Sequence, residues 1–174
     1  MLEADKNVAM VVASRDFQDR EYEGIKHLLE ETGFGVRTFS SIPGECFGVG
    51  GHMANSDGTF GDINLVDFDA IVFIGGPGAM EFFEMPDALR AAREFYSAGK
   101  IVGAICMAPV ILVNAKILGP GKRATISEGV KKSLLDAGAV FTGEDVTVDG
   151  NVLTGNGPEA TEQFAEKLCE MLGA

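Results

Sequence analysis

The sequence contains no tryptophan, two histidines and three cysteines, and few of its side chains are basic. Two histidines, His27 and His52, are too few for a histidine-rich metal site. Cys46, Cys106 and Cys169 are odd in number, widely spaced and without a C-x-x-C pair, which excludes a disulfide framework and a zinc site of the usual spacing. We therefore expect no metal ion and no cofactor.

Basic residues are also outnumbered. The chain has 14 Lys and Arg against 26 Asp and Glu, a formal net charge of −12. Such a surface repels polyanions, and the pairs at 122–123 and 131–132 are too small to form a basic patch. We expect no nucleic-acid partner.

Long hydrophobic runs are missing as well. The longest, at 7–13 and 69–74, are much shorter than the roughly 18 residues that cross a bilayer, so we expect no membrane span. The first residues, MLEADKN, carry acids where a secretory signal has basic and then apolar residues, and this favours a cytoplasmic location. A length of 174 residues is typical of one domain, so we expect 1–174 to form a single domain.

Short apolar segments alternate with segments of helical periodicity along the whole chain. This alternation predicts an α/β sandwich with a largely parallel central sheet. A hairpin through Asp149-Gly150 and a loop or small irregular hairpin at 42–61 complete the expectation. The expected strands span 7–13, 35–40, 68–74, 101–105, 124–126 and 139–141, a polar loop spans 14–19, and the expected helices span 20–32, 108–118 and 128–137, with two more from Pro86 to Gly99 and from Pro158 to Leu172.

Cys106 directly follows a buried strand and precedes a helix. Ligands collect at the carboxyl ends of parallel strands, and among the loops at that edge only this junction holds a nucleophile. A cysteine on such a turn resembles a nucleophile elbow, and the following helix N-terminus favours the thiolate. The alternative is that Cys106 is simply a small buried hydrophobic residue.

Glu21 lies four residues before Ile25 and seven before Leu28, so on a helix its carboxylate projects from the apolar face. A buried acid needs a partner, and Cys106 is expected at the same sheet edge. The alternative is a carboxylate that caps its own helix. Gly75 and Gly76 offer backbone amides for an oxyanion, although most Gly-Gly pairs merely form turns.

Four motifs together resemble the ThiJ/PfpI superfamily (DJ-one-like), of class I glutamine amidotransferase-like fold: FQDREY at 17–22, FDAIVFIGG at 68–76, GAICMAP at 103–109 and VDGNVLTGNGPE at 148–159. The resemblance implies a three-layer α/β/α flavodoxin-like sandwich and a homodimer or higher homo-oligomer. It also implies that Cys106 is the nucleophile, that Glu21 is hydrogen-bonded to its sulfur, and that Gly76 and the Met107 amide form an oxyanion hole.

The activities implied by the resemblance are glyoxalase or deglycase chemistry on reactive carbonyls, peptidase or amidase activity, and oxidative-stress sensing or chaperoning. Met107 replaces the histidine of the peptidase branch, and Met80 replaces an acid that this branch takes from a neighbouring subunit. Asn156 stands where many members have an arginine in the late loop. His52 matches no family position, but the segment that carries it can fold over the sheet edge into the cleft.

Our leading hypothesis is an enzyme that acts on small reactive carbonyls through Cys106, with Glu21 as general acid and base. A redox sensor or chaperone without turnover is the first alternative, in which Cys106 is oxidised beside a protonated Glu21. Hydrolysis of a peptide substrate ranks third, because Met107 offers no proton to the leaving amine.

Overall fold

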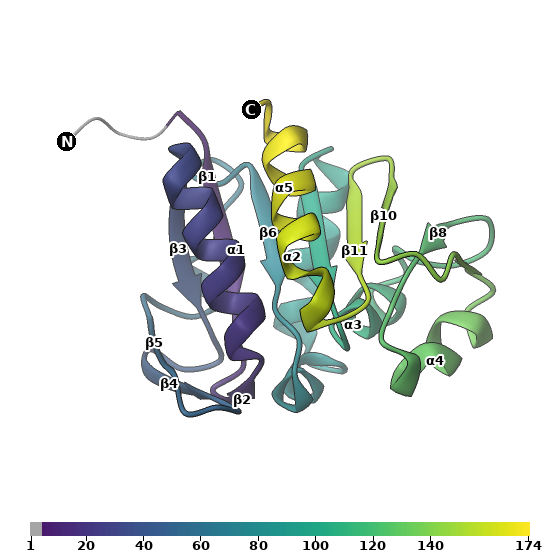
Figure 1. The fold of residues 1–174 in the computed structure, drawn as a ribbon, viewed down its shortest axis with the longest axis horizontal. Helices are drawn as coiled ribbons and strands as arrows, with labels where there is room; N and C mark the ends of the chain where they lie inside the picture. The colour runs from purple at the N-terminus through teal and green to yellow at the C-terminus, as the bar shows by residue number, and fades with distance from the viewer. Residues whose placement is uncertain (1–4) are drawn as a thin grey trace.

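Six strands form the central sheet of the computed structural model, which describes residues 5–174 (Figure 1). Each neighbouring pair is parallel except β10 and β11, which form the antiparallel hairpin expected at Asp149-Gly150. The carboxyl ends of the parallel strands therefore meet at one edge. In sheet order the strands are β10 (Val146–Asp149), β11 (Val152–Gly155), β7 (Ile101–Ile105), β6 (Ala70–Phe73), β1 (Asn7–Val11) and β3 (Gly35–Phe39).

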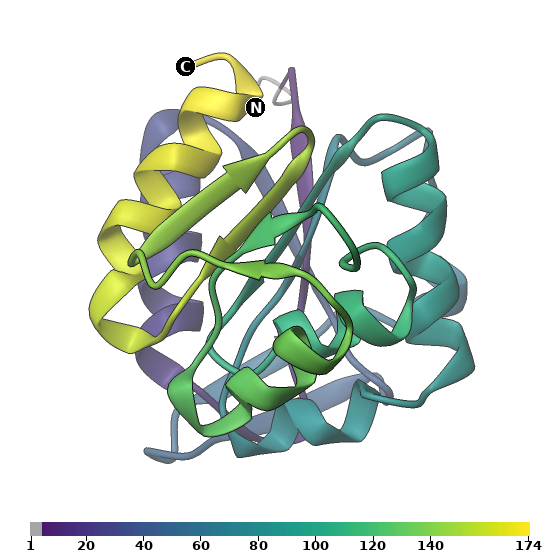
Figure 2. The ribbon, with the colours of Figure 1, turned by 90° about the vertical axis from the view of Figure 1, so that its right-hand side faces the viewer.

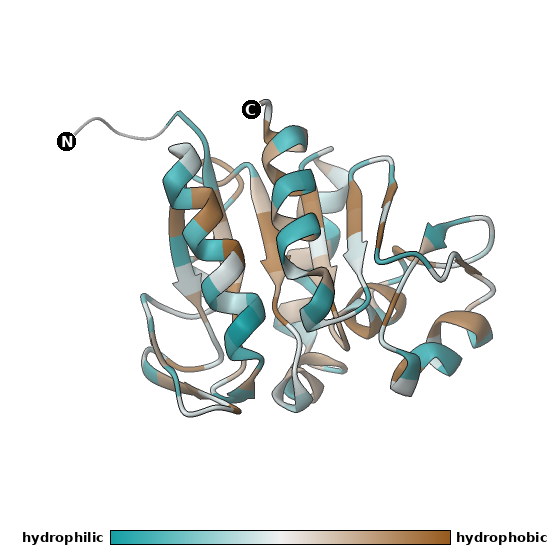
Figure 3. Ribbon diagram, viewed as in Figure 1, coloured by the Kyte–Doolittle hydropathy of each residue, from teal (hydrophilic) through white to brown (hydrophobic). Residues whose placement is uncertain are grey.

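Helices cover both faces of this sheet, so the fold is a three-layer flavodoxin-like α/β/α sandwich. Helices α1 (Asp19–Thr32) and α5 (Thr161–Leu172) lie on one face, and α2 (Pro86–Ser97) and α3 (Pro109–Asn114) lie on the other (Figure 2). Every residue of β6 is buried, which explains its unbroken apolar sequence. The strands are largely brown and the outer helix faces teal in a hydropathy colouring (Figure 3), as expected for a core between the layers.

The ends of α1 follow from its sequence. Gln18 caps the helix by accepting a hydrogen bond from the Arg20 amide. At the other end, Gly33 adopts a left-handed conformation with φ 102°, which glycine reaches without steric cost. Along the helix, Ile25 and Leu29 face the core at the expected spacing.

A second, three-stranded sheet lies at the carboxyl edge of the first. The segment expected as a loop or irregular hairpin forms the antiparallel strands β4 (Gly44–Gly48) and β5 (Met53–Ser56). The loop expected at 14–19 contains a further short strand, β2 (Arg15–Phe17), which pairs with β4. This loop prediction was wrong because the pairing is made with residues about 30 positions away, which a local pattern does not reveal.

The elements after β7 differ most from expectation. The helix expected at 108–118 is limited to α3, and the one expected at 128–137 is divided into a 3-10 turn, η3, and α4. The remaining short elements are β8 (Arg123–Ala124), β9 (Val140–Phe141), α4 (Lys131–Asp136), η1 (Phe60–Asp62), η2 (Pro77–Phe82), η3 (Glu128–Val130) and η4 (Pro158–Ala160). Among residues 5–174, no helix has the length and apolar character that a bilayer crossing requires.

Candidate active site

Cys106 occupies the turn from β7 into α3, at the carboxyl edge of the sheet. Its φ of 65° lies in the left-handed region, which costs a residue with a Cβ about 1–3 kcal/mol. The surrounding backbone holds this conformation: the Cys106 amide donates to the Gly155 carbonyl at the end of β11 (2.9 Å), and the Cys106 carbonyl accepts from the Ser127 amide (2.9 Å). The side chain is half-buried rather than enclosed in the core.

The Cys106 sulfur lies among groups that act on its ionisation in opposite directions. Burial and the negative charge of Glu21 raise the pKa of the thiol, and hydrogen bonds from the Gly76 and Met107 amides lower it. The net pKa is above that of an ordinary cysteine. The two amides that were expected to hold an oxyanion therefore both point at the sulfur.

Glu21 is completely buried, in the first turn of α1. Its Oε2 accepts a hydrogen bond from the Gly75 amide (3.1 Å) and lies beside Cys106, whereas its Oε1 is buried without a hydrogen-bond partner among residues 5–174. Burial raises the pKa of Glu21 to about 8, against the lowering effect of the Gly75 amide and the neighbouring Cys106 thiol. At neutral pH the carboxyl group is therefore protonated in most molecules.

The helix-capping alternative for Glu21 does not describe its contacts. In a capping box, this carboxylate would accept the backbone N–H of the residue before the helix. That N–H, of Gln18, donates instead to the Gly75 carbonyl (2.9 Å), and the Gln18 side chain itself caps the helix. Glu21 is left to face the sulfur.

Gly75 and Gly76 are the points of closest approach in the site. A Cβ on Gly75 would lie 2.4 Å from the Cys106 Cβ and 2.9 Å from Glu21 Oε2. Gly76 has a φ of 96°, and a Cβ there would lie 2.6 Å from the Gln18 nitrogen. Because no side chain fits, the Gly76 amide can reach the sulfur.

The amino-acid sequence also matches a known family over nearly its whole length. The sequence model of the DJ-1/PfpI family matches residues 6–171. The chain belongs to the DJ-1/PfpI family. An uncharacterised protein of Methanocaldococcus jannaschii is 37% identical to it over 95% of this chain and 82% of its own length. Deglycase PfpI of Pyrococcus furiosus is 31% identical over 94% of this chain and 98% of its own.

Solved structures agree with this membership. The ThiJ/PfpI domain protein from Brachyspira murdochii has a TM-score of 0.93 and 32% identity, with 95% of each chain covered. DJ-1beta of Drosophila melanogaster has a TM-score of 0.85 at 23% identity, covering 96% of this chain and 90% of its own, and shows the fold alone.

Two further residues that the sequence suggested for the cleft of this DJ-1/PfpI protein, His52 and Asn156, have polar partners away from the Cys106 sulfur. His52 Nδ1 is 2.6 Å from Glu23 Oε1, so the histidine lies beside the exposed side of α1, whereas Glu21 projects from the buried side. Asn156 directly follows Gly155, but its side chain donates to Asp145 Oδ1 (3.2 Å). The structure thus joins Cys106 to Glu21 and the glycines, and it gives these two polar side chains other partners.

The sequence did not indicate three contributors to the DJ-1/PfpI site. Gln18 caps α1 although glutamine is not a preferred capping residue, and its backbone links α1 to Gly75. Gly155 and Ser127 hold the backbone of Cys106. The motif at 148–159 contains Gly155, but the bond from the Cys106 amide to Gly155 depends on β11 lying next to β7.

Proposed function

We propose that this protein is a cysteine-dependent enzyme that converts small reactive carbonyls, specifically 2-oxoaldehydes, into 2-hydroxy acids. The observation that carries the proposal is the buried Glu21 carboxyl in contact with the Cys106 sulfur, beside the Gly76 and Met107 amides. A nucleophile, a proton carrier and two amide donors are thus combined in one place. The naming of relatives as deglycases agrees with chemistry on carbonyl adducts.

The first step begins when the Cys106 thiol loses its proton to solvent while Glu21 keeps its own, and the thiolate adds to the aldehyde carbon. A C–S bond forms, and the π electrons of the aldehyde move to its oxygen, where the Gly76 and Met107 amides stabilise the negative charge. Protonated Glu21 then donates its proton to this oxygen and gives a neutral hemithioacetal. Because Glu21 keeps its proton up to a pH of about 8, it can act as this acid at neutral pH.

The second step moves hydrogen between the two carbons. The Glu21 carboxylate removes the proton from the former aldehyde carbon, which gives an enediolate, and returns it to the neighbouring carbon. The hydroxyl proton on the former aldehyde oxygen passes to the neighbouring oxygen, which gives a 2-hydroxy thioester of Cys106. Water cleaves the thioester and restores the thiol. The balance is R–CO–CHO + H₂O → R–CH(OH)–COOH, with no external oxidant or reductant.

Lactate formation from methylglyoxal tests the proposal. We expect Cys106→Ser to abolish turnover and Glu21→Gln to lower kcat by roughly 100- to 10,000-fold, the range for loss of a general acid or base. Cys169→Ser, which changes a buried cysteine in α5, is the matched control and should retain activity. Lactate formation by Cys106→Ser at the wild-type rate would exclude Cys106 as the nucleophile.

Redox sensing is the second candidate, favoured by the half-buried position of Cys106 beside a proton-bearing carboxyl group. A sulfinate formed there would accept a hydrogen bond from protonated Glu21. Dilute peroxide would then add two oxygen atoms to Cys106 before Cys46 or Cys169, as peptide mass mapping can detect. Such oxidation without any methylglyoxal turnover would favour the sensor over the enzyme.

Peptidase or amidase activity is the weakest candidate. Cleavage of an amide requires a proton donor for the leaving nitrogen. Met107 follows the cysteine, and Met80 lies exposed in η2, and neither side chain can donate a proton.

A further inference from the structure

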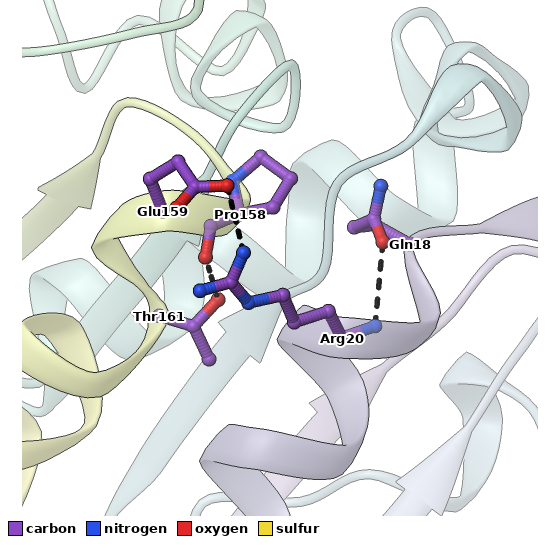
Figure 4. Close-up of polar contacts among 5 residues, drawn as sticks. All are labelled: Gln18, Arg20, Pro158, Glu159 and Thr161. Carbon is purple, nitrogen blue, oxygen red and sulfur yellow. Dashed lines mark hydrogen bonds and ion pairs between the residues drawn. The ribbon is translucent and has the colours of Figure 1, made fainter.

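An ion pair connects the two segments that lie on either side of Cys106. Arg20 Nη1, in the first turn of α1, is 2.7 Å from Glu159 Oε1, in η4 (Figure 4). Arg20 precedes Glu21, whose carboxyl group contacts the sulfur. Glu159 lies four residues after Gly155, whose carbonyl accepts the Cys106 amide. The pair therefore joins two segments that each contact Cys106.

The guanidinium group is available to another anion. The side chains of Arg20 and Glu159 are 56% and 88% exposed, and exposed ion pairs of this kind add little to stability. A dissolved carboxylate can therefore exchange with Glu159. The Arg20 backbone is fixed by the Gln18 cap, and its side chain extends from α1 toward η4 (Figure 4). A guanidinium binds a carboxylate through two parallel hydrogen bonds.

The neighbouring acids on α1 have other partners: Glu23 Oε1 lies 2.6 Å from His52 Nδ1. The Asp19 carboxylate accepts the Gly50 and His52 amides (2.6 and 2.9 Å), and Glu21 is buried and protonated below a pH of about 8. In a protein of net charge −12, this leaves the guanidinium group as a cation next to Glu21 in the sequence, and its one ion-pair partner among residues 5–174 is an exposed glutamate.

We propose that Arg20 is a specificity-determining residue that selects carbonyl substrates bearing a carboxylate, with Glu159 as the partner that the substrate displaces. As a statement about substrates, this rests on the function proposed above. As a statement about the charge environment of Cys106, it can be tested without turnover.

Alkylation of Cys106 by two matched reagents provides that test. Iodoacetate and iodoacetamide form the same S–CH₂ bond and release the same iodide, but only iodoacetate is negatively charged. Because both react with the thiolate, the ratio of their rate constants is independent of the thiolate fraction. The rate at Cys106 is followed by peptide mass mapping in wild type, Arg20→Met, Arg20→Lys and Glu159→Gln.

We expect Arg20→Met to lower the iodoacetate-to-iodoacetamide ratio by about threefold at low salt, because a positive charge on a segment that contacts Cys106 is lost. Glu159→Gln should raise the ratio, and Arg20→Lys should retain most of it. Arg90→Met is the matched control: Arg90 and Asp87 on α2 are also 2.7 Å apart and are 60% and 59% exposed. An unchanged ratio in Arg20→Met, or an equal change in Arg90→Met, would overturn the proposal.

Turnover then tests the substrate class. 4,5-Dioxopentanoate is a 2-oxoaldehyde with a carboxylate, and with water it gives 2-hydroxyglutarate by the steps described for methylglyoxal. We expect Arg20→Met to lower kcat/KM for 4,5-dioxopentanoate relative to methylglyoxal, mainly through KM. An equal loss for both substrates contradicts a role in selection. If wild type converts neither, the proposed function fails, and the alkylation ratio alone decides the role of Arg20.

Discussion

At the scale of single residues, Glu21 should make stability depend on pH. The pKa of Glu21 is about 8 in the folded protein and 4.5 in an unfolded chain. Between these pH values the folded state therefore holds one more proton than the unfolded state. Stability from this group is complete below pH 4.5 and is lost as pH rises toward 8. Glu21→Gln has no such loss. Its free energy of unfolding should therefore rise relative to that of wild type as the pH rises, by at most about 1.4 kcal/mol per pH unit.

Urea unfolding of wild type and Glu21→Gln at several pH values between 4.5 and 8 measures this difference. Glu94→Gln, at an exposed position of α2, is the control and should follow wild type throughout. A constant difference between Glu21→Gln and wild type would mean that Glu21 is ionised in the folded protein at all these pH values.

Some residues of the candidate site can be recognised from the sequence around them, and others cannot. Cys106 and Glu21 could be singled out because one follows a strand and the other lies on the apolar face of a helix, and both patterns are local. Arg20 and Gln18 could not, because their partners Glu159 and Gly75 are distant in sequence. The location of His52 depends on how the β4–β5 hairpin folds against α1, which its own sequence does not specify.

At the scale of elements, the turn after β6 can be tested through Gly75. The Cβ of Gly75→Ala would lie 2.4 Å from the Cys106 Cβ and 2.6 Å from the Ile105 carbonyl oxygen, so β6 and β7 would have to separate. We expect a loss of stability of about 1–3 kcal/mol, as for overpacked cores, together with faster alkylation of a more exposed Cys106. Gly129→Ala is the control, because nothing lies within 4 Å of its Cβ.

Thermal unfolding and the iodoacetamide rate at Cys106 measure both effects. Wild-type stability and reactivity in Gly75→Ala would contradict the close packing of these two strand ends.

The elements themselves show which signals are sufficient. The strand expected at 101–105 has the same bounds as β7, because its residues are apolar and lie between Gly99 and the helix start. The helix expected to reach Leu118 ends at Asn114, because the Asn114 side chain donates to the Phe83 carbonyl (2.7 Å) and Lys116 adopts a φ of 64°. Neither event is encoded by glycine or proline, the residues from which helix ends are usually inferred.

At the scale of the whole molecule, the outer face of the β4–β5 hairpin is our candidate for self-association. Phe47 and Met53 are directly opposite each other on this face, and both are exposed, as are the nearby Ile42 and Val49. Their neighbours Cys46 and Ala54 point inward, so the alternation of the strands presents the apolar pair to the outside. Members of the family commonly form homo-oligomers, and we expect two copies of this chain to associate through the hairpin.

Phe47→Glu should shift the protein from dimer to monomer, because two carboxylates would meet at a two-fold contact. Light scattering at tens of micromolar, roughly where a micromolar dimer is formed, provides the measurement. Val66→Glu, at a side chain that is 93% exposed and outside the hairpin, should leave the mass unchanged. A monomeric wild type, or a Phe47→Glu dimer, would show that this face does not mediate association.

The backbone conformation of Cys106 sets the need for a reactive thiol against the stability of the folded chain. Alanine normally stabilises a folded chain over glycine, since glycine loses more freedom on folding. At a φ of 65° this order should reverse, and the free energy of unfolding of Cys106→Gly should exceed that of Cys106→Ala by about 1 kcal/mol. Selection for thermal stability alone would therefore favour glycine at this position, and the thiol would be lost. Laboratory evolution for heat resistance, without any demand on activity, should accumulate that replacement, and lineages that retain cysteine would have to gain their stability elsewhere.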